Sequence, residues 1–192
     1  MAPGECRHGP GKPSNYDSAA SRLQSKLARW VMIRERSGRG TVMKLKFESV
    51  IDADLDTVWA AFENPDNMPR WQQNLESFRH ISGQAGQPGA ISELVYDEKG
   101  KRVILKQTIT ERRQPDFIAS TYESPMGKTL IVNHFEAIDD ESTRWTAWCN
   151  FTFQGFMKIM SLFVSGVIRK RTEGDMQRFK LMVETDHATV AS

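Results

Sequence analysis

Six stretches of alternating apolar and polar residues follow one another after residue 74, and they constrain the fold more than any other feature of the chain. Turn signals such as "DEKG", "QPD", "SPMG" and "DDES" separate these stretches. Alternation with a period of two is typical of strands, and connections of hairpin length join antiparallel neighbours. The earlier stretch "MKLKFESVID" alternates in the same way, so the sequence predicts seven antiparallel strands. The predicted strands begin at Met43 and then cover residues 75–82, 90–97, 101–113, 117–123, 128–138 and 143–154.

Helical patterns occur after the first strand and after the last one. Asp54 is placed as the N-cap of an amphipathic helix over residues 55–62. The segment "FENPDNMPRW" is bounded by prolines and predicts a turn or a second short helix over residues 63–73. A long helix is predicted over residues 156–186. One sheet with its helices collected on one face is an α+β fold.

The first 42 residues differ in composition from the rest of the chain. They carry eight Lys and Arg against three Asp and Glu, whereas the remaining residues carry 18 against 21. Frequent Gly and Pro predict that 1–42 is a basic, disordered leader, although residues 17–36 have the spacing of an amphipathic helix. Three interpretations stay open: a weakly folding tail, upstream sequence before a true start at Met43, or a targeting or membrane-surface segment. The predicted domain covers residues 43–187, and a disordered tail is expected over 188–192.

Composition and missing motifs exclude several classes of function. A formal net charge of +2 gives no field that favours nucleic acid. The longest apolar run, residues 156–168, is interrupted by Lys158 and is shorter than the ~20 residues of a membrane span. Two cysteines and four histidines are too few and too scattered for a disulfide framework or a metal site. The sequence has no P-loop, GxGxxG, HExxH, GxSxG or CxxC motif, so we expect neither a metal nor a cofactor. Because two cysteines make no disulfide framework, we expect a reducing compartment such as the cytoplasm.

Three segments carry a resemblance to a known family. They are "DADLDTVWAAFENPDNMPRW", "STRWTAWCNFTFQG" and "EGDMQRFKLMVE". They resemble the opening helices, the last long strand and the C-terminal helix of the START-like superfamily (SRPBCC, polyketide cyclase/dehydrase), over about residues 43–186. The resemblance implies the helix-grip fold, in which a strongly curved seven-stranded antiparallel sheet wraps around a long C-terminal helix and a cavity lies between them. Members include lipid carriers, aromatase/cyclases, quinone-binding chaperones and hormone receptors, so it is more specific for fold than for function.

The first half of the predicted long helix is apolar nearly all round. One packing face does not use that much apolar surface, and a hollow lined by this half accounts for the surplus, with ordinary dense core as the alternative. Trp71, on the Pro-bounded segment, is either a wall of the same hollow or a plug in a solid core. The helix residues predicted to line the cavity are Phe156, Met157, Met160, Phe163, Val164 and Val167.

Three polar residues are candidates for contact with a ligand. His134 lies mid-strand in "TLIVNHFEA", and an inward His134 would be a general base or a hydrogen-bond donor in an apolar hollow. The alternative is a solvated or otherwise satisfied strand histidine. Gln107 shares its strand face with apolar residues, and the Tyr122 hydroxyl is able to reach inward. His134 and Tyr122 are the candidates for catalysis.

The sequence therefore favours a binding protein for a hydrophobic small molecule, such as a lipid, a quinone or a polyketide-like aromatic. It would act as a carrier, a sensor or a chaperone. The first alternative is a cyclase/dehydratase- or hydrolase-type enzyme that uses a cavity His or Tyr. The second is a protein-interaction module. Transient contact with a membrane or with another protein is compatible with all three.

Overall fold

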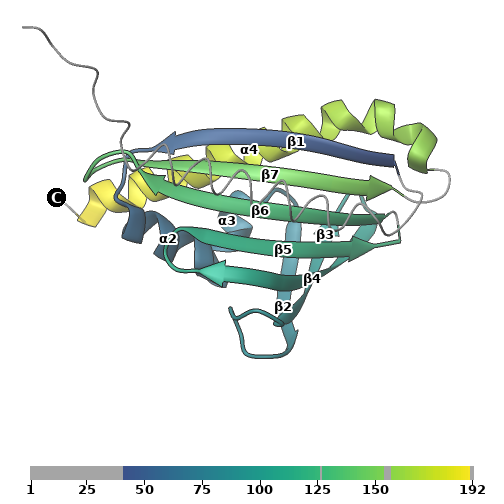
Figure 1. Ribbon diagram of the computed structural model, residues 1–192, viewed down its shortest axis with the longest axis horizontal. Coiled ribbons are helices and arrows are strands. Elements are labelled where there is room, and N and C mark those ends of the chain that lie inside the picture. The colour runs from purple at the N-terminus through teal and green to yellow at the C-terminus, as the bar shows by residue number, and fades with distance from the viewer. Residues whose placement is uncertain (1–40, 126, 154–156, 191–192) are drawn as a thin grey trace, which may run out of the picture. The chain divides into compact units, whose positions relative to one another are not determined.

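A single sheet of seven antiparallel strands forms the main layer of the domain (Figure 1). The computed structural model describes residues 41–125, 127–153 and 157–190. From β2 onward each strand pairs with the next along the chain, and β7 also pairs with β1, which gives the order β1-β7-β6-β5-β4-β3-β2. The strands are β1 (Thr41–Ile51), β2 (Leu75–Ser82), β3 (Ile91–Asp97), β4 (Arg102–Arg113), β5 (Phe117–Ser124), β6 (Gly127–Ala137) and β7 (Thr143–Phe153).

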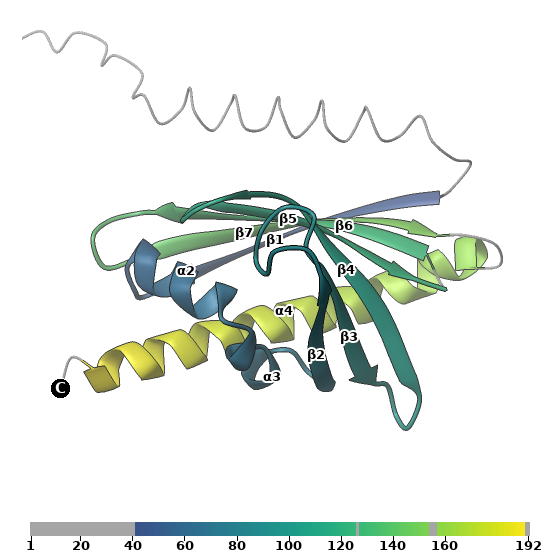
Figure 2. The ribbon, with the colours of Figure 1, turned by 90° about the horizontal axis from the view of Figure 1, so that it is seen from below.

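The sheet is strongly curved, and all helices of the described region lie on its concave side. In Figure 2, β2, β3 and β4 turn away from the direction of β1, β7 and β6, and α4 runs beneath β1, β7 and β6. Register shifts between Ile109 and Glu111 in β4, and at two places in β2, mark irregularities of the kind that bend a strand. The helical elements are α2 (Leu55–Glu63), the 3₁₀ turn η1 (Pro65–Asn67), α3 (Met68–Trp71) and α4 (Met157–Val190).

Local side-chain bonds explain where α2 begins and where the chain turns toward α3. The Asp54 carboxylate accepts a hydrogen bond from the Thr57 backbone N–H (2.9 Å) and another from the Thr57 hydroxyl (2.6 Å), as an N-cap does. Asn64 caps the following 3₁₀ turn by accepting from the Asp66 N–H (3.0 Å), and Pro65 occupies the first position of that turn. These residues place the Pro-bounded segment between α2 and β2.

Polar bonds attach the α3 segment and β1 to α4. The Arg178 guanidinium donates to the backbone oxygen of Trp71 (3.0 Å), and Arg70 makes two hydrogen bonds with the Asp186 carboxylate (2.7 and 2.8 Å). Lys180 donates to the backbone oxygen of Val50 at the end of β1 (2.6 Å). The C-terminal half of α4 is therefore fixed against both the sheet and the short helices.

Two apolar clusters form the core, one on each part of the curved sheet. The first packs α2 and α4 against β1, β6 and β7, and the second packs α3 against β2 and β3. The largest members of the first cluster are Trp59, Trp71, Phe135, Trp145 and Phe179. The second cluster consists of Met68, Leu75, Leu94 and Tyr96. The separation of the two clusters leaves the concave side of the sheet incompletely filled.

The predicted fold class, seven-stranded sheet and long C-terminal helix are confirmed. Two boundaries differ from the sequence prediction. β1 begins at Thr41, before Met43, because its pairing with β7 extends to Phe153. The long helix continues to Val190, so it includes residues 188–190, which we had assigned to a disordered tail. The predicted leader, apart from residues 41 and 42, lies outside the described residues.

Candidate functional site

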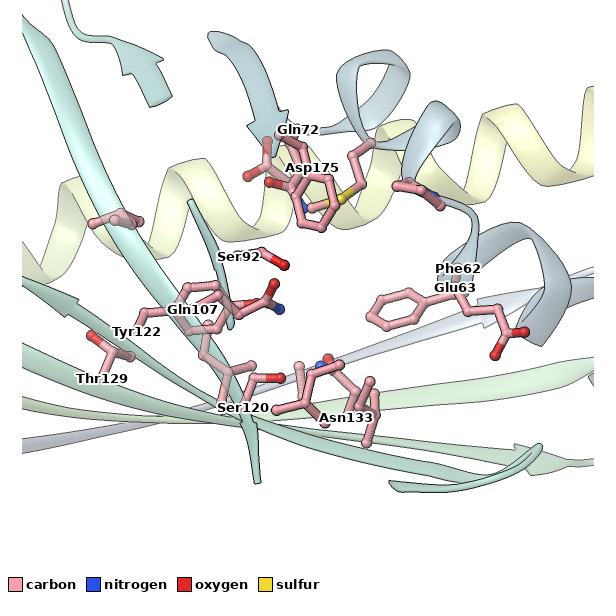
Figure 3. A pocket seen from close by; sticks show the side chains of 18 of the residues that line it. Phe62, Glu63, Gln72, Ser92, Gln107, Ser120, Tyr122, Thr129, Asn133 and Asp175 are labelled. Carbon is pink, nitrogen blue, oxygen red and sulfur yellow. The ribbon is translucent and has the colours of Figure 1, made fainter. Parts of the chain in front are cut away.

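A cavity of about 740 Å³ lies on the concave side of the sheet. Its wall takes residues from β2 to β7, from α2, α3 and α4, and from the loop between β2 and β3. Figure 3 shows Gln107, Tyr122 and Ser120 projecting from the strands, with Gln72 and Asp175 on the helical side. This volume lies in the range of sites that enclose a drug-sized molecule, roughly 300–1,000 Å³.

One wall of the cavity is aromatic. Phe62 of α2 stacks on Trp71 with ring centroids 5.8 Å apart, and its edge-to-face contact with Trp145 is 5.4 Å. Trp71 in turn contacts Phe179 of α4 at 5.4 Å. Trp71 is 7% exposed, so it belongs to the core cluster and to the cavity wall together. The two alternatives considered for Trp71 are therefore both true of this side chain.

Gln107 and Tyr122 form a neutral polar pair on the sheet wall. They face each other in the β4–β5 register, and Gln107 Nε2 donates to the Tyr122 hydroxyl oxygen at 2.9 Å. Burial raises the pKa of Tyr122 to about 12, so the hydroxyl is protonated at neutral pH. Within the described ranges the two side chains make no other hydrogen bond, which leaves the Tyr122 O–H as a donor and Gln107 Oε1 as an acceptor.

Charged residues of the wall are paired with one another. At the α2 end, Arg112 donates to the Glu63 carboxylate (2.5 Å) and to Gln114 (3.1 Å), and its guanidinium lies over the Trp59 ring at 5.6 Å. An arginine that is paired and stacked in this way is not a free cation. A ligand with a carboxylate would have to compete with Glu63 for it.

A second charged group lies where α4 crosses the α3–β2 connection. Arg171 pairs with Glu98, donates to the backbone oxygen of Gln73 (2.9 Å) and lies over the Tyr96 ring at 4.9 Å. Asp175 accepts from the Gln73 N–H (3.0 Å) and pairs with a second arginine of α4. Burial raises the pKa of Asp175, although these partners act in the opposite direction. These contacts hold the connection against α4 at one end of the cavity.

The structure places Trp71, Gln107 and Tyr122 in the cavity wall, and their contact with a ligand stays a prediction. The prediction of an inward His134 is wrong. The cavity face of β6 carries Thr129, Ile131 and Asn133, so His134 points to the opposite face of the sheet.

On that outer face, His134 lies beside Trp148, with ring centroids 6.5 Å apart, and 3.9 Å from the Asp116 carboxylate. Burial lowers the pKa of His134, although the neighbouring carboxylates act in the opposite direction. Because successive side chains of a strand face opposite sides of a sheet, His134 cannot contact a molecule in the cavity.

The prediction for the long helix is partly wrong. Val167 is 69% exposed and does not line the cavity, because it lies one residue, or about 100° around the helix, from Ile168, which does. Phe156 and the side chains of Met157, Met160, Phe163 and Val164 lie outside the described residues. Among the α4 side chains that the structure describes, those that line the cavity are Ile168, Arg171, Thr172, Asp175 and Met176.

Sequence reasoning ranked Asn133 as a weaker candidate than His134, and it did not name Ser120 or Ser92. Asn133, Ser120 and Ser92 are each less than 9% exposed and line the cavity. The alternation of β7 contains the signal that finds Asn133, because Trp145, Ala147 and Cys149 share one face and Asn133 pairs with Ala147. Applying that register to β6 would have selected Asn133 instead of His134.

Comparison with known proteins agrees with this architecture. Residues 43–181 match the family described as polyketide cyclase / dehydrase and lipid transport. The chain belongs to this family. No curated protein matches the sequence significantly.

Solved structures with the same fold differ strongly from the chain in sequence. Ara h 8.0201 aligns with a TM-score of 0.61 at 15% identity, covering 76% of this chain and 99% of its own. The Zhui aromatase/cyclase from Streptomyces sp. R1128 gives 0.64 at 14% identity, covering 75% and 94%. A point mutant of norcoclaurine synthase from Thalictrum, in complex with a transition-state analogue, gives 0.60 at 12% identity, covering 79% and 99%. At these identities the similarity establishes the helix-grip fold alone. None of the helices in the described part of the chain has the length and apolar character needed to cross a bilayer.

Proposed function

We propose that the protein binds one uncharged hydrophobic small molecule in the cavity between the sheet and α4, as a carrier, a sensor or a chaperone. The cavity of about 740 Å³ carries the proposal. Its aromatic wall of Phe62, Trp71 and Trp145 offers apolar contact area, and Gln107 and Tyr122 offer a few oriented polar groups. An apolar hollow with a small number of placed polar groups is the general form of a small-molecule site.

The charges of the wall favour an uncharged ligand over a fatty acid. Arg112 and Arg171 are engaged by Glu63 and Glu98 respectively. A carboxylate brought into the cavity would lose its hydration, and a charge that is buried without a free partner is costly. Neutral aromatic or lipid-like molecules with hydroxyl or carbonyl oxygens meet no such penalty.

Dye binding to two matched variants tests the proposal. Leu105 lines the cavity, whereas its neighbour Ile104 is 52% exposed and faces the other way. We expect the uncharged dye N-phenyl-1-naphthylamine to become fluorescent with the protein at one site per chain. Leu105→Trp should weaken the binding of the dye by narrowing the cavity, and Ile104→Trp should preserve it. Equal signals from both variants would refute binding in this cavity.

Native mass spectrometry of freshly purified protein addresses the natural ligand. We expect a fraction of the protein to carry one additional non-covalent mass, lost on denaturation and reduced in the Leu105→Trp variant. Cys149 is a free, buried thiol, which is compatible with a protein that binds its ligand in the reducing cytoplasm.

A cyclase- or dehydratase-type enzyme is the second candidate, favoured by the Tyr122 hydroxyl. With a pKa of about 12, Tyr122 is suited to donate a hydrogen bond or a proton to a substrate carbonyl, and not to act as a base. Two proteins of similar fold carry names of enzymes, an aromatase/cyclase and norcoclaurine synthase. Tyr122→Phe separates the candidates, because a carrier keeps its ligand chemically unchanged with either residue, whereas an enzyme converts it only with Tyr122.

A further inference from the structure

Asn133 presents a buried amide to the cavity. It lies in the middle of β6, is 8% exposed, and pairs in register with Ile118 of β5 and Ala147 of β7. Figure 3 shows it on the sheet wall, on the same side as Ser120 and below Phe62. A polar side chain this buried normally has all its hydrogen-bonding groups engaged.

The Trp145 side chain fixes which way the Asn133 amide points. Trp145 Nε1 donates to Asn133 Oδ1 at 3.0 Å, and Trp145 is 3% exposed. An indole N–H is a donor only, so the atom it contacts must be the amide oxygen. The Asn133 NH₂ group is therefore the end of the amide that is turned away from Trp145.

This NH₂ group has no hydrogen-bond acceptor among the residues that the structure describes. Within the same residues, the fully buried side-chain nitrogens and oxygens without a partner are Trp59 Nε1 and Trp71 Nε1. Asn133 Nδ2 is not one of them, so it retains exposed surface even though its residue is buried. Because Asn133 lines the cavity, this surface faces the cavity.

The surroundings of the NH₂ group define the acceptor that it would take. Its register partners Ile118 and Ala147 are apolar, and its neighbours on the β6 cavity face are Ile131 and Phe135. A neutral donor among apolar groups compensates the desolvation of a carbonyl oxygen much better than that of a carboxylate.

Asn133 is also separate from the polar pair described above. Tyr122 is four residues along β5 from Ile118, which corresponds to about 13 Å of strand at ~3.3 Å per residue. The two polar groups therefore contact different ends of a bound molecule.

We propose that Asn133, oriented by Trp145, is a specificity residue that donates a hydrogen bond from Nδ2 to a carbonyl oxygen of the bound molecule, so that the site selects uncharged aromatic ketones. This rests on the proposed function, that the cavity holds a hydrophobic ligand. Trp145 acts as the positioning residue, because its N–H prevents the amide from presenting its oxygen to the cavity.

The matched probes fluorene and 9-fluorenone test the proposal, since they share one tricyclic shape and differ in a CH₂ and a C=O group. Each displaces N-phenyl-1-naphthylamine from the wild type, and we expect fluorenone to bind roughly 2- to 12-fold more tightly, as one net hydrogen bond gives. Asn133→Leu should reduce this ratio to about one. The ratio is informative even if the variant is less stable, because both probes meet the same altered cavity.

The carbonyl stretching band of bound fluorenone supplies a second measurement. It should lie at lower frequency in the wild type than in Asn133→Leu, because a hydrogen bond weakens the C=O bond. Ile104→Leu, at an exposed position that faces away from the cavity, serves as the control and should leave both the ratio and the band unchanged.

The outcomes separate the two proposals. If neither probe nor the dye binds, the proposed function fails. If both probes bind the wild type equally, or if Tyr122→Phe and not Asn133→Leu removes the preference, the cavity binds ligands but the role of Asn133 is refuted.

Discussion

The buried hydrogen bond from Trp145 to Asn133 can be tested by its effect on stability, without any ligand. The two residues are diagonal neighbours on adjacent strands, since Trp145 pairs with Phe135 and Asn133 with Ala147. Both are buried, and their bond measures 3.0 Å. Removing either partner leaves the other without its bond inside the protein, which costs the bond itself and the desolvation of the remaining group, about 1–3 kcal/mol.

A double-mutant cycle isolates this interaction from the packing lost in each variant. Asn133→Leu leaves the Trp145 N–H unsatisfied, and Trp145→Phe leaves the Asn133 oxygen unsatisfied and also removes part of a ring. The double variant loses the bond once and leaves neither partner orphaned. We therefore expect it to be less destabilised than the sum of the single variants by about 1–3 kcal/mol.

Urea denaturation followed by circular dichroism measures the four free energies of unfolding. The variants must share the wild-type slope with denaturant, so that the midpoints report stability alone. Additivity within about 0.5 kcal/mol would show that the two side chains are not coupled. In that case the amide of Asn133 would be free to turn, and the argument for an NH₂ group directed into the cavity would collapse.

Further predictions concern the cap, the core and the thiol. Asp54→Ala should lower the free energy of unfolding by about 1 kcal/mol at neutral pH. Hydrogen bonds from Thr57 lower the folded-state pKa of Asp54, so the stability difference between wild type and variant is present above the unfolded pKa of about 3.9 and is lost as the pH falls through the folded pKa. Urea titrations repeated at decreasing pH measure this loss. Phe179→Ala removes a fully buried ring and should lower the free energy of unfolding by about 3–5 kcal/mol. Leu181→Ala, on the exposed side of the same helix, should lower it much less. Equal losses of thermal stability in the two variants would contradict the packing described. In a Cys6→Ser background, Cys149 should react with a thiol reagent only as fast as the protein opens, because it is 2% exposed and burial raises its pKa to about 12; rapid labelling of the folded protein would be inconsistent with its position.

Strand alternation was sufficient to predict the sheet, but not the direction in which each strand faces. In β7 Trp145, Ala147, Cys149 and Phe151 share one face, so the inward side of Trp145 is readable from the sequence. In β6 both faces are apolar, with Leu130 and Val132 on one and Ile131 and Phe135 on the other. Periodicity gives no preference between these faces, and only the register with β7 decides it.

The part of α4 that lines the cavity was only partly predictable from the sequence, for a related reason. Apolar residues around the whole helix circumference indicate burial, but they do not say which other elements provide it. In the described part of α4, the stripe that lines the cavity mixes apolar residues such as Ile168 and Met176 with Arg171, Thr172 and Asp175. Hydrophobicity therefore favoured a cavity beside the helix, but it could not select a stripe that contains charged and polar residues.

The distribution of polar groups explains why such a cavity is compatible with a stable fold. Each of the two apolar clusters packs against helices, α2, α3 and α4 for the first and α3 for the second, so each forms without filling the space between them. The charged groups of the wall are paired, and its neutral amides and hydroxyls include Gln107, Tyr122 and Asn133, each already anchored by one bond to the protein. Anchoring fixes the direction of the remaining donor or acceptor at little entropic cost on binding. A hollow built in this way binds by shape and by a few directed hydrogen bonds, and substitutions that keep its volume but remove an anchor should change which ligand is preferred more than how tightly an apolar molecule of the same shape is held.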